Sequence, residues 1–402
     1  ASNTNGKVGI GAYYKEGAFA DTGIITVNST STALDGAGDP VRPIGVFYGE
    51  NSVKNVADIV LAPGSDEAIG MYGTNLASFN NSGDITLNAK GIGAYFVNSN
   101  VTNTGDIDIN AAGGYGAYFK GGVSNSSGTV TAAGNNSVAM IVSGTGGKVT
   151  NTGIILAQGT SSIGVYAENG GEFINSGTLN STAAGSSIGG FAKQGTLTNT
   201  GNITSEYMGL YGKDASTINH SGTMTISSGI GILVDGNSST ANLTGGTITD
   251  TGTNMTAVVG KNTGKVNLNG TNIVMSNNSV GMILDGGSSV LTSGNITVGN
   301  SGTGIYAENS SIDISGYSGS ISMGSKGIAV YADDSTLTSG SFNTVYSSGA
   351  GDKGVGIYYK GTSPITNAAE VVHTGNHLVS IYADGVNITN TGNQTIQNDG
   401  IG

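Results

Sequence analysis

Side chains able to do acid–base or nucleophilic chemistry are sparse in this chain. Its 402 residues include 26 Asp and Glu, three His and no Cys. Asp333 with Asp334 and Asp106 with Asp108 are the nearest approaches to several acids on one strand, and the surrounding pattern places both pairs in solvated turns or at strand edges. Glycoside hydrolysis needs two carboxylates facing one bond, and no repeat offers several acids together. The sequence therefore predicts no enzyme and no catalytic residue.

The three histidines and the absence of cysteine give no indication of a metal site or a cofactor. His373 and His377 are four residues apart but lie in no helical pattern, and His220 falls in a turn where we expect polar surface. Without Cys there is no disulfide and no thiolate ligand. We expect no metal site and no cofactor.

Charge and hydropathy argue against a nucleic-acid-binding protein and against a protein with membrane-spanning helices. The net charge is -12, with only 14 Lys and Arg, so the basic footprint that nucleic-acid binding requires is missing. The sequence contains no run of 18 apolar residues, so we expect no helix that spans a bilayer. The first residues, ASNTNGKVG, do not form a signal peptide and are interpreted as the start of a mature fragment.

One phrase recurs about every two dozen residues along the whole sequence. Its clearest copy is Ile163 to Asn180, IGVYAENGGEFINSGTLN. It opens on an apolar-small-apolar-large segment, continues through a segment ending in Asn-Ser/Thr-Gly, such as Val101 to Gly105, and closes on a short alternating segment, such as Ile85 to Leu87. Alternation with period two predicts half-buried strands, and no segment has helical spacing.

A repeat of this length with three short strands is typical of one coil of a stacked solenoid. The sequence predicts an all-β fold: a single-stranded, right-handed parallel β-helix of about sixteen coils, roughly 24 residues each, with three short strands per coil. We expect residues 1–402 to form one continuous segment. The recurring turn predicts a ladder of stacked amides formed by Asn103, Asn125, Asn151, Asn175 and Asn199.

Strand alternation predicts which side chains face outward. In the copy at Ile163, we expect Ile163, Val165 and Ala167 in the core and Gly164, Tyr166 and Glu168 outside, because an unpaired Glu avoids burial. This predicts an outward column of large side chains, a shallow groove of Gly and Ala beside it, and a charged column such as Lys213, Asp235, Lys261 and Asp285.

The aromatic members of that column are the candidate binding residues, because large apolar patches on a surface mark contact sites. They are Tyr72, Tyr95, Tyr118, Tyr166, Phe191, Tyr211, Tyr306, Tyr331, Tyr358 and Tyr382. Tyr13, Phe47, Ile141, Leu233, Val259 and Ile283 complete the column. Two alternatives stay open: the rings only stack to stabilise the sheet, or the strand parity is reversed and they form the core.

Two interruptions of the repeat predict loops. Residues 30–43, TSTALDGAGDPVRP, form the longer one and carry Asp35, Asp39 and Arg42, the only arginine, as candidate binding residues. Residues 343–353 form a smaller excursion. Insertions between solenoid repeats lie on the surface and often carry function.

The repeats at Ile163 to Asn180 and Ile92 to Ile109 resemble the passenger repeats of type V autotransporters, especially the large fusobacterial outer-membrane adhesins. The resemblance covers essentially the whole chain. It implies a β-helical passenger on the cell surface, secreted unfolded through a C-terminal outer-membrane β-barrel of the same chain that is absent here. It also implies attachment, as in coaggregation or biofilms, to a glycan or protein receptor on host cells or other bacteria. No binding residue of the family carries over by position.

The function expected from the sequence is that of a monomeric, non-enzymatic adhesin segment that binds through its outer surface. Two other functions stay open. One is a carbohydrate-active β-helix enzyme, a polysaccharide lyase or hydrolase, which an acidic cluster in a cleft would favour. The other is a structural stalk that presents a distal binding tip.

Overall fold

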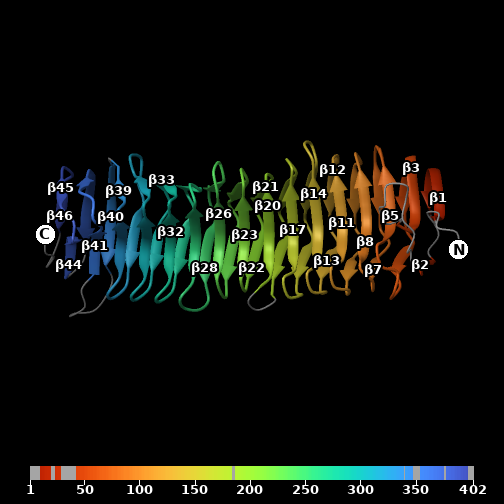
Figure 1. Cartoon of the computed structure of the whole chain (residues 1–402), viewed down its shortest axis with the longest axis horizontal. Helices are drawn as coiled ribbons and strands as arrows, with labels where there is room; N and C mark the ends of the chain where they lie inside the picture. Colours follow the sequence, from red (N-terminus) through yellow and green to blue (C-terminus); the bar gives the residue numbers. More distant parts are fainter. Residues whose placement is uncertain are drawn as a thin grey trace. The chain divides into compact units, whose positions relative to one another are not determined.

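The computed structural model describes residues 10–19, 23–28, 42–182, 186–338, 340–346, 354–374 and 377–396. It is an all-β parallel β-solenoid of about 14 turns with a spacing of roughly 24 residues and no helix (Figure 1). The predicted fold class is confirmed, and the coil count of sixteen is slightly high. β1 (Ile10–Phe19) and β3 (Ile44–Asn55) each merge the first two strands of their repeats.

The chain divides into two compact units, residues 1–202 and 203–402. In the first unit, the first strands of successive repeats are β1, β3, β5 (Ala68–Thr74), β8 (Gly91–Val97), β11 (Tyr115–Lys120), β14 (Val138–Ser143), β17 (Ile163–Glu168) and β20 (Ile188–Lys193). The second strands are β6 (Phe79–Asn81), β9 (Val101–Asn103), β12 (Val123–Ser126), β15 (Lys148–Asn151), β18 (Glu172–Asn175) and β21 (Thr196–Asn199). The third strands are β2 (Ile24–Val27), β4 (Asp58–Leu61), β7 (Ile85–Leu87), β10 (Ile107–Ile109), β13 (Thr129–Ala132), β16 (Ile154–Ala157) and β19 (Thr178–Ser181).

The second unit has the same order, and β22 (Asn202–Ser205) falls on the boundary. Its first strands are β23 (Met208–Lys213), β26 (Ile230–Asp235), β29 (Thr256–Lys261), β32 (Val280–Asp285), β35 (Thr303–Glu308), β38 (Ile328–Asp333), β41 (Gly354–Lys360) and β44 (Leu378–Asp384). Its second strands are β24 (Thr217–His220), β27 (Thr240–Leu243), β30 (Lys265–Asn269), β33 (Ser288–Ser293), β36 (Ser311–Asp313), β39 (Thr336–Leu337), β42 (Ile365–Asn367) and β45 (Ile388–Asn390). Its third strands are β25 (Thr223–Ile226), β28 (Thr247–Asp250), β31 (Asn272–Met275), β34 (Ile296–Val298), β37 (Ser320–Met323), β40 (Gly340–Tyr346), β43 (Ala369–Thr374) and β46 (Gln394–Ile396).

Almost every strand pairs in parallel with the same strand of the next turn, so equivalent residues stack; β39 and β42 are the exception. In the first unit Tyr166 of β17 pairs with Phe191 of β20, and Phe173 of β18 pairs with Leu197 of β21. The inward residues, such as Val165 and Phe173, are buried. No single turn could bury these side chains alone, so the core forms only between turns. Among the residues that the structure covers, none forms a helix with the length and hydropathy needed to cross a bilayer.

The predicted strand parity is right for the residues from Val165 to Glu168 and wrong for Ile163 and Gly164. Val165 and Ala167 are buried, and Tyr166 and Glu168 face outward. Gly164 also faces inward: a Cβ there would lie 2.7 Å from Leu179 Cδ1 and 2.5 Å from the Gly189 carbonyl oxygen. Two consecutive residues point into the core, and the first position takes only a small residue, such as the buried Ala139 and Ala257 of other turns. The predicted surface groove of Gly and Ala therefore does not form, and Ile163 is half-buried instead of in the core.

An amide ladder runs inside the corner that follows the second strand. In the first unit Asn55 Nδ2 donates to Asn81 Oδ1 at 2.7 Å, and Asn81 Nδ2 donates to Asn103 Oδ1 at 2.7 Å. A second run joins Asn151 to Asn175 at 2.9 Å and Asn175 to Asn199 at 2.7 Å. These asparagines are buried, and buried amides are stable only when they are hydrogen-bonded.

Asn125 does not belong to the ladder, which corrects the prediction. Ser126 pairs with Asn103 and with Asn151, whereas Asn125 pairs with Thr102 and Thr150 and is exposed. The corner glycine sets this register, because Gly128 stacks on the Gly105 backbone. Two residues separate Asn125 from Gly128, whereas one residue separates Asn103 from Gly105. The buried Ser126 hydroxyl has no hydrogen-bond partner, so the ladder is interrupted there.

The ladder predicts unequal costs for two asparagine deletions. Asn175→Ala leaves the Asn151 donor and the Asn199 acceptor without their ladder partners, so we expect a loss of about 3 kcal/mol in the free energy of unfolding. Asn125→Ala is the matched control, and we expect less than about 0.5 kcal/mol from this exposed position. Denaturant unfolding followed by circular dichroism measures both variants. Equal losses would contradict an energetic role of the ladder.

Candidate binding surface

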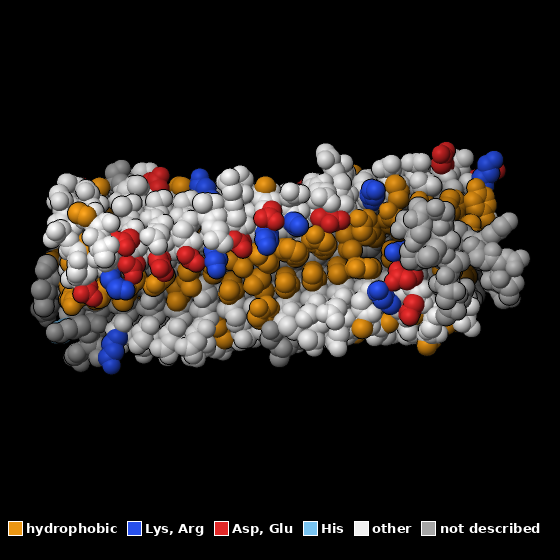
Figure 2. Space-filling view, in the orientation of Figure 1, with side chains coloured by type: hydrophobic (Ala, Val, Ile, Leu, Met, Phe, Trp, Pro, Cys, Tyr) orange, Lys and Arg blue, Asp and Glu red, His pale blue; other side chains and the backbone are white. Residues whose placement is uncertain are grey.

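The ten candidate aromatic residues lie in one outward column within each unit, here called the aromatic column. In the first unit the register stacks Tyr13, Phe47, Tyr72, Tyr95, Tyr118, Ile141, Tyr166 and Phe191. In the second it stacks Tyr211, Leu233, Val259, Ile283, Tyr306, Tyr331, Tyr358 and Tyr382. Most members are half-buried by their neighbours. Figure 2 shows, within each unit, apolar side chains gathered beside charged side chains of both signs.

Ring stacking is tight but not uniform along the column. In the second unit the rings of Tyr306 and Tyr331 are 4.9 Å apart and nearly parallel, at 5°, and those of Tyr331 and Tyr358 are 5.0 Å apart at 17°. In the first unit Tyr95 is instead perpendicular to Tyr72, at 76°, and to Tyr118, at 87°. Parallel rings cover each other's faces and offer mainly their edges, whereas perpendicular rings leave faces open.

The charged column lies two residues further along each strand, as predicted. Lys213, Asp235, Lys261 and Asp285 stack in sequence in the second unit. Lys261 and Asp285 approach to 3.8 Å, and Lys360 and Asp333 to 3.2 Å. Exposed ion pairs contribute about 0 to 1 kcal/mol each, so alternation mainly avoids placing like charges side by side.

The tyrosine hydroxyls link the two columns. Tyr211 donates to Asp235 Oδ2 at 3.2 Å, and Tyr358 donates to Asp384 Oδ2 at 3.1 Å. Partial burial and the Asp235 charge raise the pKa of Tyr211 to about 12. The Tyr211 phenol therefore remains a protonated donor at neutral pH, and the carboxylates form a row of acceptors beside the rings.

The predicted loop residues are described only in part. Asp35 and Asp39 lie outside the described residues. Arg42 pairs with Glu67 at 3.3 Å, and Lys90 pairs with the same carboxylate at 3.0 Å. Of the predicted excursion at 343–353, residues 343–346 belong to β40 and pair with β37, and residues 347–353 lie outside the described residues.

Two of the acidic residues noted in the sequence, Asp106 and Asp334, accept backbone amides. Asp106 Oδ1 accepts the amide of Thr129 at 2.7 Å, and Asp334 Oδ1 accepts the amides of Thr362 and Ser363 at 3.0 and 3.2 Å. Within the described ranges no three Asp, Glu or His side chains gather as metal ligands would. His377 is half-buried, and the His373 side chain is not described.

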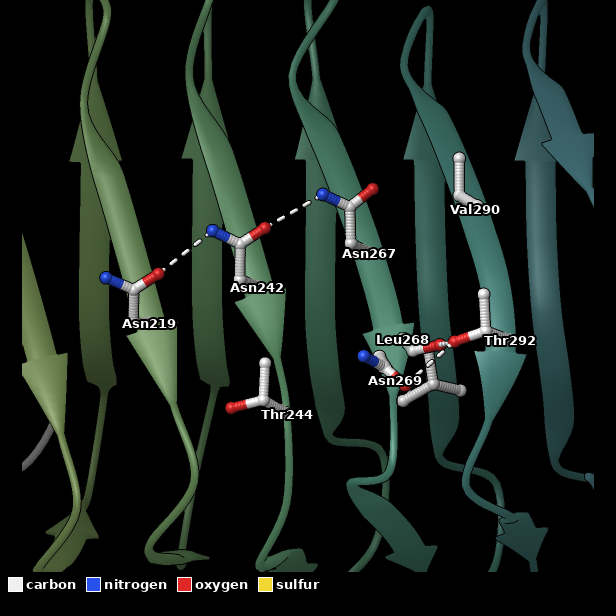
Figure 3. A pocket seen from close by; sticks show the side chains of 8 residues that line it. All are labelled: Asn219, Asn242, Thr244, Asn267, Leu268, Asn269, Val290 and Thr292. Atoms are coloured by element: carbon white, nitrogen blue, oxygen red, sulfur yellow. Dashed lines mark hydrogen bonds between the residues drawn. The ribbon is translucent and has the colours of Figure 1, made fainter.

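Sequence reasoning missed a polar hollow of about 380 Å³ on the second strands of the second unit. A row of outward asparagines lines it: Asn267 Nδ2 donates to Asn242 Oδ1 at 2.8 Å, and Asn242 Nδ2 donates to Asn219 Oδ1 at 2.9 Å (Figure 3). Val290 ends the row in the next turn, where a bulge at Asn269 shifts the register and Thr292 donates to Asn269 Oδ1. The signal was available: Asn219, Asn242 and Asn267 occupy one phase of the repeat.

Comparisons of the chain with protein-family models, with curated proteins and with solved structures give no match. The class of the protein is therefore defined by its fold, a parallel β-solenoid built from a repeat of roughly 24 residues. This fold occurs in both enzymes and non-enzymes.

His220 contradicts its sequence interpretation, because it is fully buried and not polar surface. It ends β24 at the inward position that Leu243 fills in the next turn. Burial lowers the pKa of His220 to about 4, although a backbone hydrogen bond with Thr247 acts in the opposite direction. The imidazole is therefore neutral in the folded protein at pH 7.

This burial predicts an acid-sensitive second unit. The unfolded chain takes up a proton on His220 below about pH 6.5, whereas the folded protein resists protonation until about pH 4. The contribution of the buried, neutral His220 to the free energy of unfolding is fully present above pH 6.5, and the free energy of unfolding falls by about 3 kcal/mol as the pH drops to 4. His220→Asn, which is neutral throughout, removes this part of the pH dependence. We expect the free energy of unfolding of the parent, relative to that of the variant, to fall by about 3 kcal/mol between pH 7 and pH 4, and parallel curves over this range would contradict the assignment.

Proposed function

We propose that this chain is an extracellular, non-enzymatic adhesin segment that attaches to other bacteria or to host cells through its aromatic column. The supporting observation is the column itself: aromatic rings held outward on consecutive turns, beside a row of carboxylates and ammonium groups. Asp106 and Asp334 accept backbone amides, and Asp333 pairs with Lys360.

The physical basis of such binding is a rigid array. Each ring is fixed by its neighbours and loses little conformational freedom when a ligand binds, and tyrosine offers both an apolar body and a polar tip. Tyr382, at 48% exposure, and Tyr13, at 60%, leave the most ring surface open. Modest contacts on successive turns act together against a repetitive surface, and many copies on one cell multiply the effect. The partner is a glycan or protein receptor on a cell surface.

Binding of the purified chain to glycan arrays and to candidate bacterial and host cells tests this proposal. The variant Tyr306→Ser, Tyr331→Ser, Tyr358→Ser removes three consecutive rings, and we expect affinity to fall by about tenfold or more, because aromatic contacts contribute about 0.5 to 1.5 kcal/mol each.

The matched control is Thr225→Ser, Thr249→Ser, Thr297→Ser, which alters three outward positions on the third strands of the same unit. It is expected to bind like the parent. Equal binding by all three proteins would eliminate this part of the column as the contact surface. A stalk function would show as no binding by the parent.

A further inference from the structure

One strand of the first unit is covered where its neighbours are open. All six residues of β14 are buried. Ile141 and Ser143 occupy the outward positions of the aromatic and charged columns, yet each is only 5% exposed. The equivalent residues of β17, Tyr166 and Glu168, are half-buried. A side chain from another turn must therefore lie over β14.

The covering side chain is Tyr118 of β11. Its hydroxyl donates to Glu168 Oε1 at 3.1 Å. Tyr118 pairs with Ile141, and Ile141 pairs with Tyr166, so the hydroxyl reaches two turns beyond its own strand. The ring must cross β14 to do this, and its plane is perpendicular to that of Tyr95, at 87°. The half-buried Tyr118 side chain thus covers Ile141 and keeps part of its own surface in contact with solvent.

This arrangement makes Tyr118 a fixed platform. The ring is held at its Cβ by β11 and at its hydroxyl by Glu168 of β17, so it is already ordered before any ligand arrives. Burial, together with the Glu168 charge, raises the pKa of Tyr118, so the phenol stays a donor at neutral pH. Tyr306 and Tyr331 differ, because their parallel stacking covers the faces of both rings.

We propose that Tyr118 is the platform subsite for one uncharged hexopyranose unit of a cell-surface glycan, an inference that rests on the proposed function. The apolar C–H face of a pyranose fits a flat aromatic face, and its hydroxyls need an acceptor and a donor at the rim. Glu168 supplies the carboxylate, and Lys193 stacks beside it in the next turn. These two charges offset each other, which favours a neutral sugar over an acidic one.

The chain contains no tryptophan, so a single Tyr118→Trp substitution places the sole indole at the proposed subsite and keeps a ring face there. The probes are cellohexaose, mannohexaose and a galactohexaose, titrated into the full chain. We expect at least one of them to change the emission of Tyr118→Trp saturably. The matched control is Tyr207→Trp, at an exposed tyrosine outside the aromatic column, and its emission is expected to stay unchanged. By calorimetry, Tyr118→Ala is expected to raise the Kd for that sugar by about tenfold. Tyr118→Phe, which keeps the ring and loses the Glu168 contact, is expected to cause a smaller rise.

The outcomes separate the subsite from the proposed function. If the parent binds cells or arrayed glycans but Tyr118→Trp emission is silent and Tyr118→Ala binds like the parent, the platform is overturned and the adhesin proposal stands. If the parent binds neither sugars nor cells, both are overturned. Thermal unfolding of each variant shows whether the fold is intact. Should Tyr118→Ala fail to fold, the tryptophan pair and Tyr118→Phe still decide the question.

Discussion

Parallel stacking of one turn on the next is the constraint on which the rest of this structure depends. Strands lie about 4.8 Å apart, so every residue is placed against its equivalent in the adjacent turn. A residue type that packs against or hydrogen-bonds to an identical side chain at this distance can occupy the same position in successive turns. A charged residue is repelled by an identical neighbour, so positions of this kind alternate in sign. Rings stack, amides donate to amides, and lysines alternate with aspartates for this single reason.

The same constraint explains how much could be predicted from the sequence. A repeat with period-two alternation identified the solenoid and the outward position of Tyr166, because each rests on a pattern summed over many copies. One error is common to the copies: the small residue of the first strand, such as Gly164, points inward because two successive residues turn into the core. Other errors arose where one copy differs from the average. Ser126 replaces Asn125 in the ladder because the corner glycine sets the register. His220 is buried because it fills an inward strand position.

Regularity also limits what the surface can do. A column of parallel rings gains stability by covering ring faces, and those faces are what a flat ligand would contact. The second-unit rings from Tyr306 to Tyr358 are therefore well suited to stabilising the sheet and to contact through their hydroxyl edges. The two interpretations of the aromatic column, stacking and binding, are in this sense competing uses of the same ring surface.

Binding capacity should therefore concentrate where the repeat is broken. At Ile141 of the first unit the aromatic series lacks a ring, and Tyr118 reaches across β14 to Glu168. At Val290 the outer asparagine row ends, and a bulge opens the polar hollow beside it. In both places one copy of the repeat carries a different residue. The side chain of the neighbouring turn then lacks an equivalent to pair with and keeps surface that a ligand can contact. In a solenoid of near-identical turns, the informative positions for function are the exceptions to the repeat and not its consensus.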